Sequence, residues 1–173
     1  MINYLLVDGY NVIHDVDELK KASLLSLDIA RVNLSDALCE YAVLSGYRVI
    51  LVFDAHLVAD GVGSIQEYRG IKIVFTKEAQ TADQYIERAA YKLSKQSKKE
   101  RVSVATSDSV EQLIILASGA FRITPGELWK EVKRAKENMR QRYNQSRPIK
   151  RNPIESLIDA ETAEKLEAMR YGK

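Results

Sequence analysis

The sequence is poor in the residues that form cross-links or soft metal sites: its 173 residues include one cysteine, two histidines and three prolines. The lone Cys39 rules out an internal disulfide framework and is typical of a reducing compartment. Because it lies in an apolar helical pattern, we expect a small buried hydrophobe. His14 and His56 are too few and too scattered for a zinc site, which needs clustered His or Cys.

Long apolar runs are also missing. No stretch approaches the roughly 18 consecutive apolar residues of a membrane span, and the N-terminus lacks a basic region followed by an apolar signal core. We therefore expect a cytoplasmic protein with no membrane partner. The formal net charge is only +2, so any attraction to nucleic acid must come from where the charges lie. The 46% of hydrophobic residues suffice for one principal core.

Short apolar runs predict strands, and helical spacing of apolar residues falls between most of them. Several of the runs are apolar almost throughout, as a parallel sheet covered on both faces requires. Gly46 and Gly119 are plausible helix ends. The alternation predicts a three-layer α/β domain with a mainly parallel central sheet of about five strands flanked by helices. The predicted strands are 4–7, 49–53, 71–75, 102–105 and 121–123, and the clearest helical patterns cover 27–41 and 82–93.

Two further segments complete the outline of the chain. Residues 55–70 contain glycines that interrupt any long helix and are interpreted as a mobile loop with a short helix or hairpin inside it. A last helix begins at Pro125, and residues 130–151 then carry nine Lys or Arg against two Glu. We expect a main domain over residues 1–143, followed over 144–173 by a basic linker and a short amphipathic segment.

Acidic residues recur where the predicted strands end. Asp8 follows the first strand and Asp54 the second, whereas Asp83 and Asp108 lie shortly beyond the third and fourth. The carboxyl ends of parallel strands share one edge of the sheet, where open α/β sheets bind ligands. Four carboxylates gathered there repel one another unless a cation binds among them. Oxygen-only ligands favour Mg²⁺ or Mn²⁺.

Each acidic residue also has a simpler explanation. Asp8-Gly9 is compatible with an ordinary turn, and Asp54 with a turn at a strand end. Asp83 follows Thr81 in a capping-box pattern, and Asp108 could cap a helix of its own. These separate explanations do not account for a carboxylate at the end of each of the first four strands. The joint site is therefore the preferred interpretation.

Polar residues near the four carboxylates are candidates for supporting roles. Asn11 could orient a carboxylate or a bound water, although the capping of a following turn explains its position equally well. Glu87 lies one helical turn beyond Asp83 on the same face and is a candidate for supporting a ligand. Thr106 and Ser107 could hold the fourth strand end through their hydroxyl groups.

The segments VDGYNVI, FDA, TKEAQTADQYIE and ATSD, from residues 7, 53, 76 and 105 onward, resemble the YacP-like branch of the NYN domains, relatives of the PIN-domain nucleases. The resemblance covers residues 3 to about 143. It implies a PIN-like fold and a divalent-metal site at Asp8, Asp83 and Asp108, with Asn11 beside them and Asp54 as a further acidic member. It also implies an endoribonuclease that cleaves mRNA in association with the translating ribosome, with a metal-activated water attacking the phosphorus.

Two other classes of function stay open on the sequence. A non-catalytic module that binds RNA or the ribosome could use the carboxylates for a structural metal only. A phosphohydrolase with an aspartyl nucleophile is less favoured, because Tyr10 stands where such enzymes need a second Asp. A dinucleotide enzyme is disfavoured, because Gly61-Val62-Gly63 does not open a helix after a strand. We expect a monomer.

An RNA substrate requires cations that hold its phosphates and surfaces that stack its bases. Tyr10, Tyr68 and Tyr85 could stack bases or could instead pack against the domain. The basic candidates are equally compatible with solvated helix faces. They are Arg69 and Lys77, which are expected nearer the site, then Lys95, Lys98, Lys99 and Arg101, and the later group Arg134, Arg140, Arg142, Arg147, Lys150 and Arg151.

Overall fold

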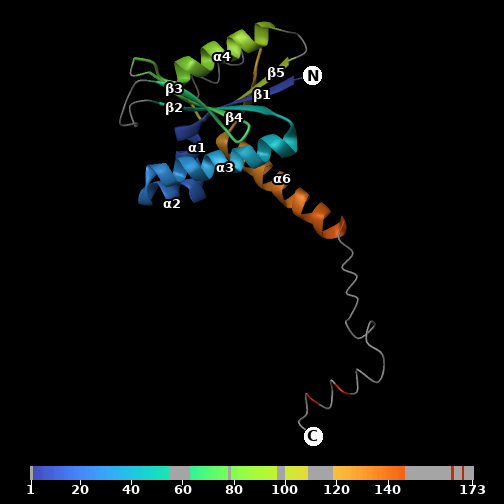
Figure 1. Ribbon diagram of the computed structural model, residues 1–173. Helices are drawn as coiled ribbons and strands as arrows, with labels where there is room; N and C mark the ends of the chain where they lie inside the picture. The colour runs from blue at the N-terminus through green and yellow to red at the C-terminus, as the bar shows by residue number, and fades with distance from the viewer. Residues whose placement is uncertain are drawn as a thin grey trace. The chain divides into compact units, whose positions relative to one another are not determined.

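The computed structural model describes residues 2–54, 63–77, 79–96, 100–108 and 119–146, together with residues 165 and 169. Six strands form one sheet in the order β3-β4-β2-β1-β5-β6 (Figure 1). The strands are β1 (Ile2–Asp8), β2 (Arg48–Phe53), β3 (Ser64–Tyr68), β4 (Ile71–Phe75), β5 (Glu100–Ala105) and β6 (Phe121–Ile123). The helices are α1 (Gly9–Asp15), α2 (Asp17–Leu25), α3 (Leu27–Ser45), α4 (Ala82–Gln96) and α6 (Pro125–Ser146).

All five predicted strands are confirmed, and every pairing among them is parallel. The sixth strand, β3, lies within the segment interpreted as a loop and pairs antiparallel with β4. The turn between them consists of Arg69 and Gly70, both with positive φ (47° and 89°). Four of the five β3 residues are exposed, so this edge strand carries no apolar run that predicts it. Residues 55–62 lie outside the described part of the chain.

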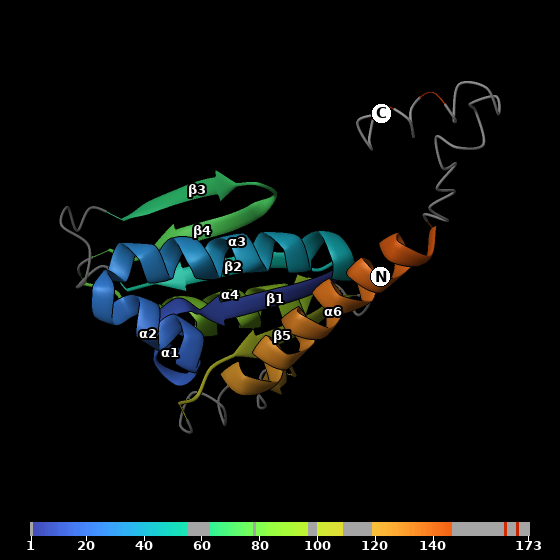
Figure 2. The ribbon, with the colours of Figure 1, turned by 90° about the horizontal axis from the view of Figure 1, so that it is seen from below.

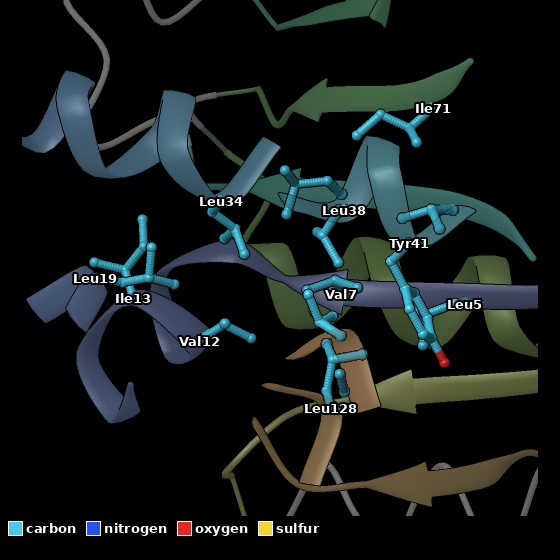
Figure 3. Packing of buried hydrophobic residues seen from close by; sticks show 14 of the residues in the cluster. Leu5, Val7, Val12, Ile13, Leu19, Leu34, Leu38, Tyr41, Ile71 and Leu128 are labelled. Carbon is cyan, nitrogen blue, oxygen red and sulfur yellow. The ribbon is translucent and has the colours of Figure 1, made fainter. Parts of the chain in front are cut away.

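The central strands are buried on both faces, which explains their nearly continuous apolar sequence. Leu5 and Val7 point to one face and belong to the larger core cluster, whereas Leu6 points to the other and packs under α4. Figure 3 shows the larger cluster, where Leu34 and Leu38 of α3 approach the β1 side chains. Figures 1 and 2 show α1, α2, α3 and α6 on this face and α4 on the opposite one. The three-layer prediction is confirmed.

The helix ends follow local chemistry. The helix predicted from residue 27 ends at Gly46, whose φ of 75° is the left-handed conformation common after helices. The helix predicted from Pro125 opens with a reciprocal cap. The Thr124 hydroxyl accepts from the Glu127 amide (3.2 Å), and the Glu127 carboxylate accepts from the Thr124 amide (2.8 Å). The short helices α1 and α2, of seven and nine residues, were not predicted because segments so short show little periodicity.

The chain forms two compact units, Met1–Met139 and Arg140–Lys173. The last turns of α6 thus belong to the second unit. The proposed division after residue 143 stays a prediction, and the amphipathic segment predicted near the C-terminus lies almost wholly outside the described residues. Among the helices that the structure describes, none has the length and apolar character to cross a membrane.

Candidate active site

Three neighbouring strands bring acidic residues to the same edge of the sheet. β1 lies between β2 and β5 and runs parallel to both, with Asp8 opposite Val52 and Val7 opposite Ala105. Asp8 is the last residue of β1, Asp54 directly follows β2, and Asp108 lies three residues beyond β5. Parallel strands in this register end together. Asp8, Asp54 and Asp108 therefore lie at the carboxyl edge of the sheet, as predicted.

The fourth carboxylate, Asp83, reaches the same edge from a helix. α4 opens with Thr81, whose hydroxyl accepts from the Gln84 amide (3.2 Å), so the predicted cap is present. The Ala82 amide donates to Oδ2 of Asp54 (3.4 Å). This bond attaches the first turn of α4 to the end of β2. Asp83 is the next residue and so lies beside the strand ends.

The pKa of Asp83 is affected by all three of the other carboxylates. Burial raises the pKa of Asp83 above its ordinary value of 3.8, and the negative charges of Asp8 and Asp108 raise it further. A hydrogen bond with the Asp8 carboxylate and the charge of Asp54 act in the same direction. All three of the other acidic residues thus act on this one. The cluster is therefore a concentration of negative charge at the carboxyl edge of the sheet.

Asp8 is held rigidly by Asn11. The Asn11 amide donates to Asp8 Oδ1 (3.0 Å), and its side-chain Nδ2 donates to Oδ2 (2.6 Å). Asp8 is thereby the N-cap of α1, and it is only 4% exposed. The Ser107 hydroxyl donates in turn to Oδ1 of Asn11. Asn11 therefore joins the end of β1 to the segment after β5, which supports the orienting interpretation over the capping one.

The other supporting candidates differ in their placement. Thr106 is completely buried, and its hydroxyl accepts from the Asp108 amide (3.1 Å), which shapes the turn that carries Asp108. Glu87 is exposed on α4. Its supporting role stays a prediction.

Gly9 and Phe53 set the spacing of the first two strand ends. A Cβ on Gly9 would lie 2.2 Å from Cε1 of Phe53. The ring therefore occupies the space that any other residue at position 9 would need. Tyr10 packs on the same ring with an edge-to-face geometry at 5.1 Å, so it is a core residue rather than a base-stacking one. The absence of a side chain at Gly9 brings Phe53, and with it Asp54, close to Asp8.

Sequence reasoning missed Arg31. Its guanidinium donates to the Tyr10 hydroxyl (2.8 Å) and pairs with Asp28. The pKa of Tyr10 is raised by burial and lowered by Arg31, and the charge of Asp54 also raises it. Arg31 thus supplies positive charge behind the acidic edge. Its sequence signal was weak, because a single arginine in an amphipathic helix normally faces solvent.

The basic candidates are distributed differently from the prediction. Lys77 lies at the carboxyl edge, two residues beyond β4. The expectation that Arg69 lies near the site was wrong, because β3 runs antiparallel and its turn lies at the opposite edge, where Arg69 pairs with Asp36 (3.1 Å). Arg101, near the start of β5, and Lys95, in the last turn of α4, also lie toward that opposite edge.

The remaining basic candidates are untested by position. Arg134, Arg140 and Arg142 lie on α6 and are exposed. The residues Lys98, Lys99, Arg147, Lys150 and Arg151 lie outside the described part of the chain. Tyr68 donates to Asp36 (2.9 Å) at the edge opposite the site.

The donor set fits a hard divalent cation. The acidic cluster with its neighbours Asn11, Thr106 and Ser107 offers carboxylate, amide and hydroxyl oxygens, which suit Mg²⁺ or Mn²⁺ better than zinc. Within the described residues, no three His, Cys, Asp or Glu side chains already form a closed ligand set. Such a set is not required, since Mg²⁺ usually keeps several waters and binds through one or two carboxylates.

Comparisons with known proteins place this geometry in a class and then in a family. The six-stranded, mostly parallel sheet with acidic strand ends is a PIN-like α/β fold. A family model of the YacP-like NYN domain matches residues 5–171, which includes the tail beyond the motifs. YacP of Bacillus subtilis is 40% identical over 141 residues, covering 82% of this chain and 81% of that protein.

Solved structures give the same result. A crystal structure of Rae1 (YacP) from Bacillus subtilis matches with a TM-score of 0.72 and 37% identity, covering 98% of this chain and 95% of that one. The crystal structure of a point mutant of the same Bacillus subtilis protein matches with a TM-score of 0.70 and 35% identity, over 85% and 86%. The chain belongs to the YacP-like NYN domain family. Its NYN domain supports a nuclease-type function related to RNA.

Proposed function

We propose that this protein is a metal-dependent endoribonuclease that cleaves mRNA, acting in association with the translating ribosome. One observation carries the proposal: four carboxylates from three strand ends and one helix gather at one edge of the sheet, where burial, and then the charges of the other three, raise the pKa of Asp83. Repulsion among these carboxylates destabilises the fold, and carboxylates with shifted pKa values are found most often at functional sites. The resemblance to PIN-like nucleases indicates which use.

The chain's own residues would hold and orient the reacting groups. Asp8, Asp83 and Asp108 would bind Mg²⁺ or Mn²⁺, directly or through water, and Asp54 would complete the acidic edge. When bound, the ion supplies positive charge for the phosphate and lowers the pKa of a water. Asn11 keeps both oxygens of Asp8 in one orientation, and Thr106 does the same for the turn that carries Asp108.

The reaction is a hydrolysis in which the RNA 2′-hydroxyl takes no part. A water oxygen forms a bond to phosphorus, the bond from phosphorus to the ribose 3′ oxygen breaks, and that oxygen takes up a proton. The products are a 5′-phosphate and a 3′-hydroxyl. End analysis of the fragments checks this, and 2′,3′-cyclic phosphate ends would refute the mechanism.

The test is an mRNA cleavage assay with and without translating ribosomes, each with Mg²⁺, Mn²⁺ or chelator. We expect cuts that require the metal, and an Asp8→Asn, Asp83→Asn protein that loses them while still binding RNA. Asp36→Asn is the matched control, because Asp36 pairs with Arg69 at the opposite edge. Retained cleavage in the double variant would remove the site assignment. Binding without any metal-dependent cut would favour the non-catalytic module instead.

A further inference from the structure

A cavity of about 220 Å³ lies next to the acidic edge and has no part in the proposed chemistry. Its large apolar side chains are Ile65 of β3, Val74 of β4 and Tyr85 of α4, and Gly63, Ser64, Phe75 and Thr76 also line it. Lys77 and Gln80, from the connection between β4 and α4, add a cation and an amide. The cavity therefore combines an apolar interior with a few polar groups, as small-molecule sites do.

The topology explains why this corner of the sheet is open. Ile65 pairs with Val74 across the antiparallel ladder, so the two side chains share a face. Val74 belongs to the core cluster under α4, but that helix packs on β5, β1 and β2. Among the described residues, the main contacts of α4 thus stop short of the edge strand β3, whose Ile65 is 64% exposed. The hollow lies between this edge and the beginning of α4.

The cavity and the acidic cluster are built from adjacent residues. Tyr85 comes two residues after Asp83 on α4. On the strand side, the Thr76 amide donates to the Phe53 carbonyl (3.0 Å), and Phe53 precedes Asp54. The cavity and the carboxylates are therefore built on the same first turns of α4 and on the neighbouring ends of β2 and β4.

We propose that the cavity is a nucleobase subsite, which receives one base of single-stranded RNA beside the scissile phosphate and stacks it on Tyr85. This inference rests on the proposed function and deepens it by naming a source of sequence preference. Single-stranded RNA is recognised by bases stacked on aromatic rings and hydrogen-bonded at their edges. Gln80 offers an amide for the base edge, and Lys77 a cation for the adjoining phosphate.

The size of the cavity supports a single base as the occupant. Pockets for drug-sized ligands measure about 300–1,000 Å³, so 220 Å³ suits a smaller planar group. An apolar side chain of a partner protein is the competing occupant. Such a side chain has no anionic group to pair with Lys77 or with a cation held by the adjoining carboxylates.

The test compares RNA substrates that differ at one nucleotide. After the cleavage site is mapped, each flanking position is made abasic in turn, and kcat/KM is measured for the full-length protein. With the wild-type protein, removing the base at one flanking position should lower kcat/KM by about 5- to 160-fold, which is the rate equivalent of the stacking energy of a base on an aromatic ring. Tyr85→Ala should lower kcat/KM on the intact RNA and cut the intact and abasic RNAs at equal rates. Tyr85→Phe should behave like the wild type in stacking.

Two further variants keep the test specific. Ile65→Ala changes another wall at an exposed position and should lose part of the discrimination without affecting folding. Tyr91→Ala is the matched control, since Tyr91 is 57% exposed on the same helix, six residues beyond Tyr85. It should retain the full effect of the abasic position. An equal effect in the wild type and in Tyr85→Ala, or no effect at any flanking position, would overturn the subsite.

A binding measurement separates this inference from the proposed function. Fluorescence anisotropy of the same RNAs in EDTA needs no cleavage, and the wild type and Tyr85→Ala are compared at each abasic position. A position whose effect disappears in Tyr85→Ala supports the subsite even if the protein cuts no RNA. Cleavage by the wild type, with binding and kcat/KM unaffected by Tyr85→Ala, would leave the nuclease intact and remove the subsite.

Discussion

Gly9→Ala tests how the acidic edge is held together. The added Cβ would lie 2.2, 2.5 and 2.9 Å from three carbons of the Phe53 ring, far inside normal contact. Phe53 is 1% exposed and also stacks on Phe75 at 5.5 Å, so it cannot turn away freely. Overpacking of this kind costs about 1–3 kcal/mol. For a chain of this size, about 2 kcal/mol lowers Tm by about 4–8 °C.

Gly126→Ala is the matched control, because a Cβ there meets nothing within 4 Å and the residue also lies in the first turn of a helix. Replacing glycine without strain should stabilise by about 0.4–1 kcal/mol. Thermal and urea denaturation, followed by circular dichroism, measure both variants. Adding Phe53→Leu to Gly9→Ala should cost less than the sum of the single changes. Equal effects of the two glycine substitutions would refute the packing argument.

Two more predictions concern the charges and hydrogen bonds of the site. Because the folded pKa of Asp83 is raised, the native state holds this proton more tightly than the unfolded chain does. The contribution of Asp83 to stability should therefore fall as pH rises from 3.8 through the raised pKa. In chelator, the Tm of Asp83→Asn should therefore equal that of the wild type near pH ~3 and exceed it near pH ~7. Added Mg²⁺ should raise the Tm of the wild type more than that of the variant. Thermal denaturation over a range of pH measures both effects, and a wild type as stable as the variant at neutral pH in chelator would contradict the prediction. Asn11→Ala removes the side-chain hydrogen bond to the buried Asp8 carboxylate and the one accepted from Ser107, whereas the backbone bond to Asp8 stays. The change should cost about 1.5–3 kcal/mol. A loss below about 0.5 kcal/mol in urea denaturation would show that the Asn11 side chain does not hold Asp8.

Parts of the fold were predictable because buried strands and helix faces require apolar residues at regular positions in the sequence. The strands at 49–53 and 102–105 are covered on both faces, so their sequence is largely apolar. The helix from residue 27 and its end at Gly46 follow from spacing and from a left-handed cap. β3 left no such record, since an exposed edge strand buries little. Its direction decides where Arg69 lies, and that prediction failed for this reason.

The candidate site divides in the same way. Four carboxylates shortly after four predicted strands are a property of the sequence, and parallel pairing places three of them, Asp8, Asp54 and Asp108, on one edge. Only the tertiary structure decided how they meet. Ser107 donates to Asn11 across 96 residues of sequence, and Ala82 donates to Asp54 across 28. Such contacts depend on strand register and helix placement, which no local pattern encodes.

The sequence by itself determined the order of the main strands and helices, the ends of the strands and the acidic residues that follow them, because these depend on neighbours a few positions apart. The tertiary structure decided that the ring of Phe53 fills the space above Gly9, that Asp83 carries a raised pKa, and that a cavity opens beside Tyr85. Each of these results from packing between segments distant in the chain, where shape and burial act together.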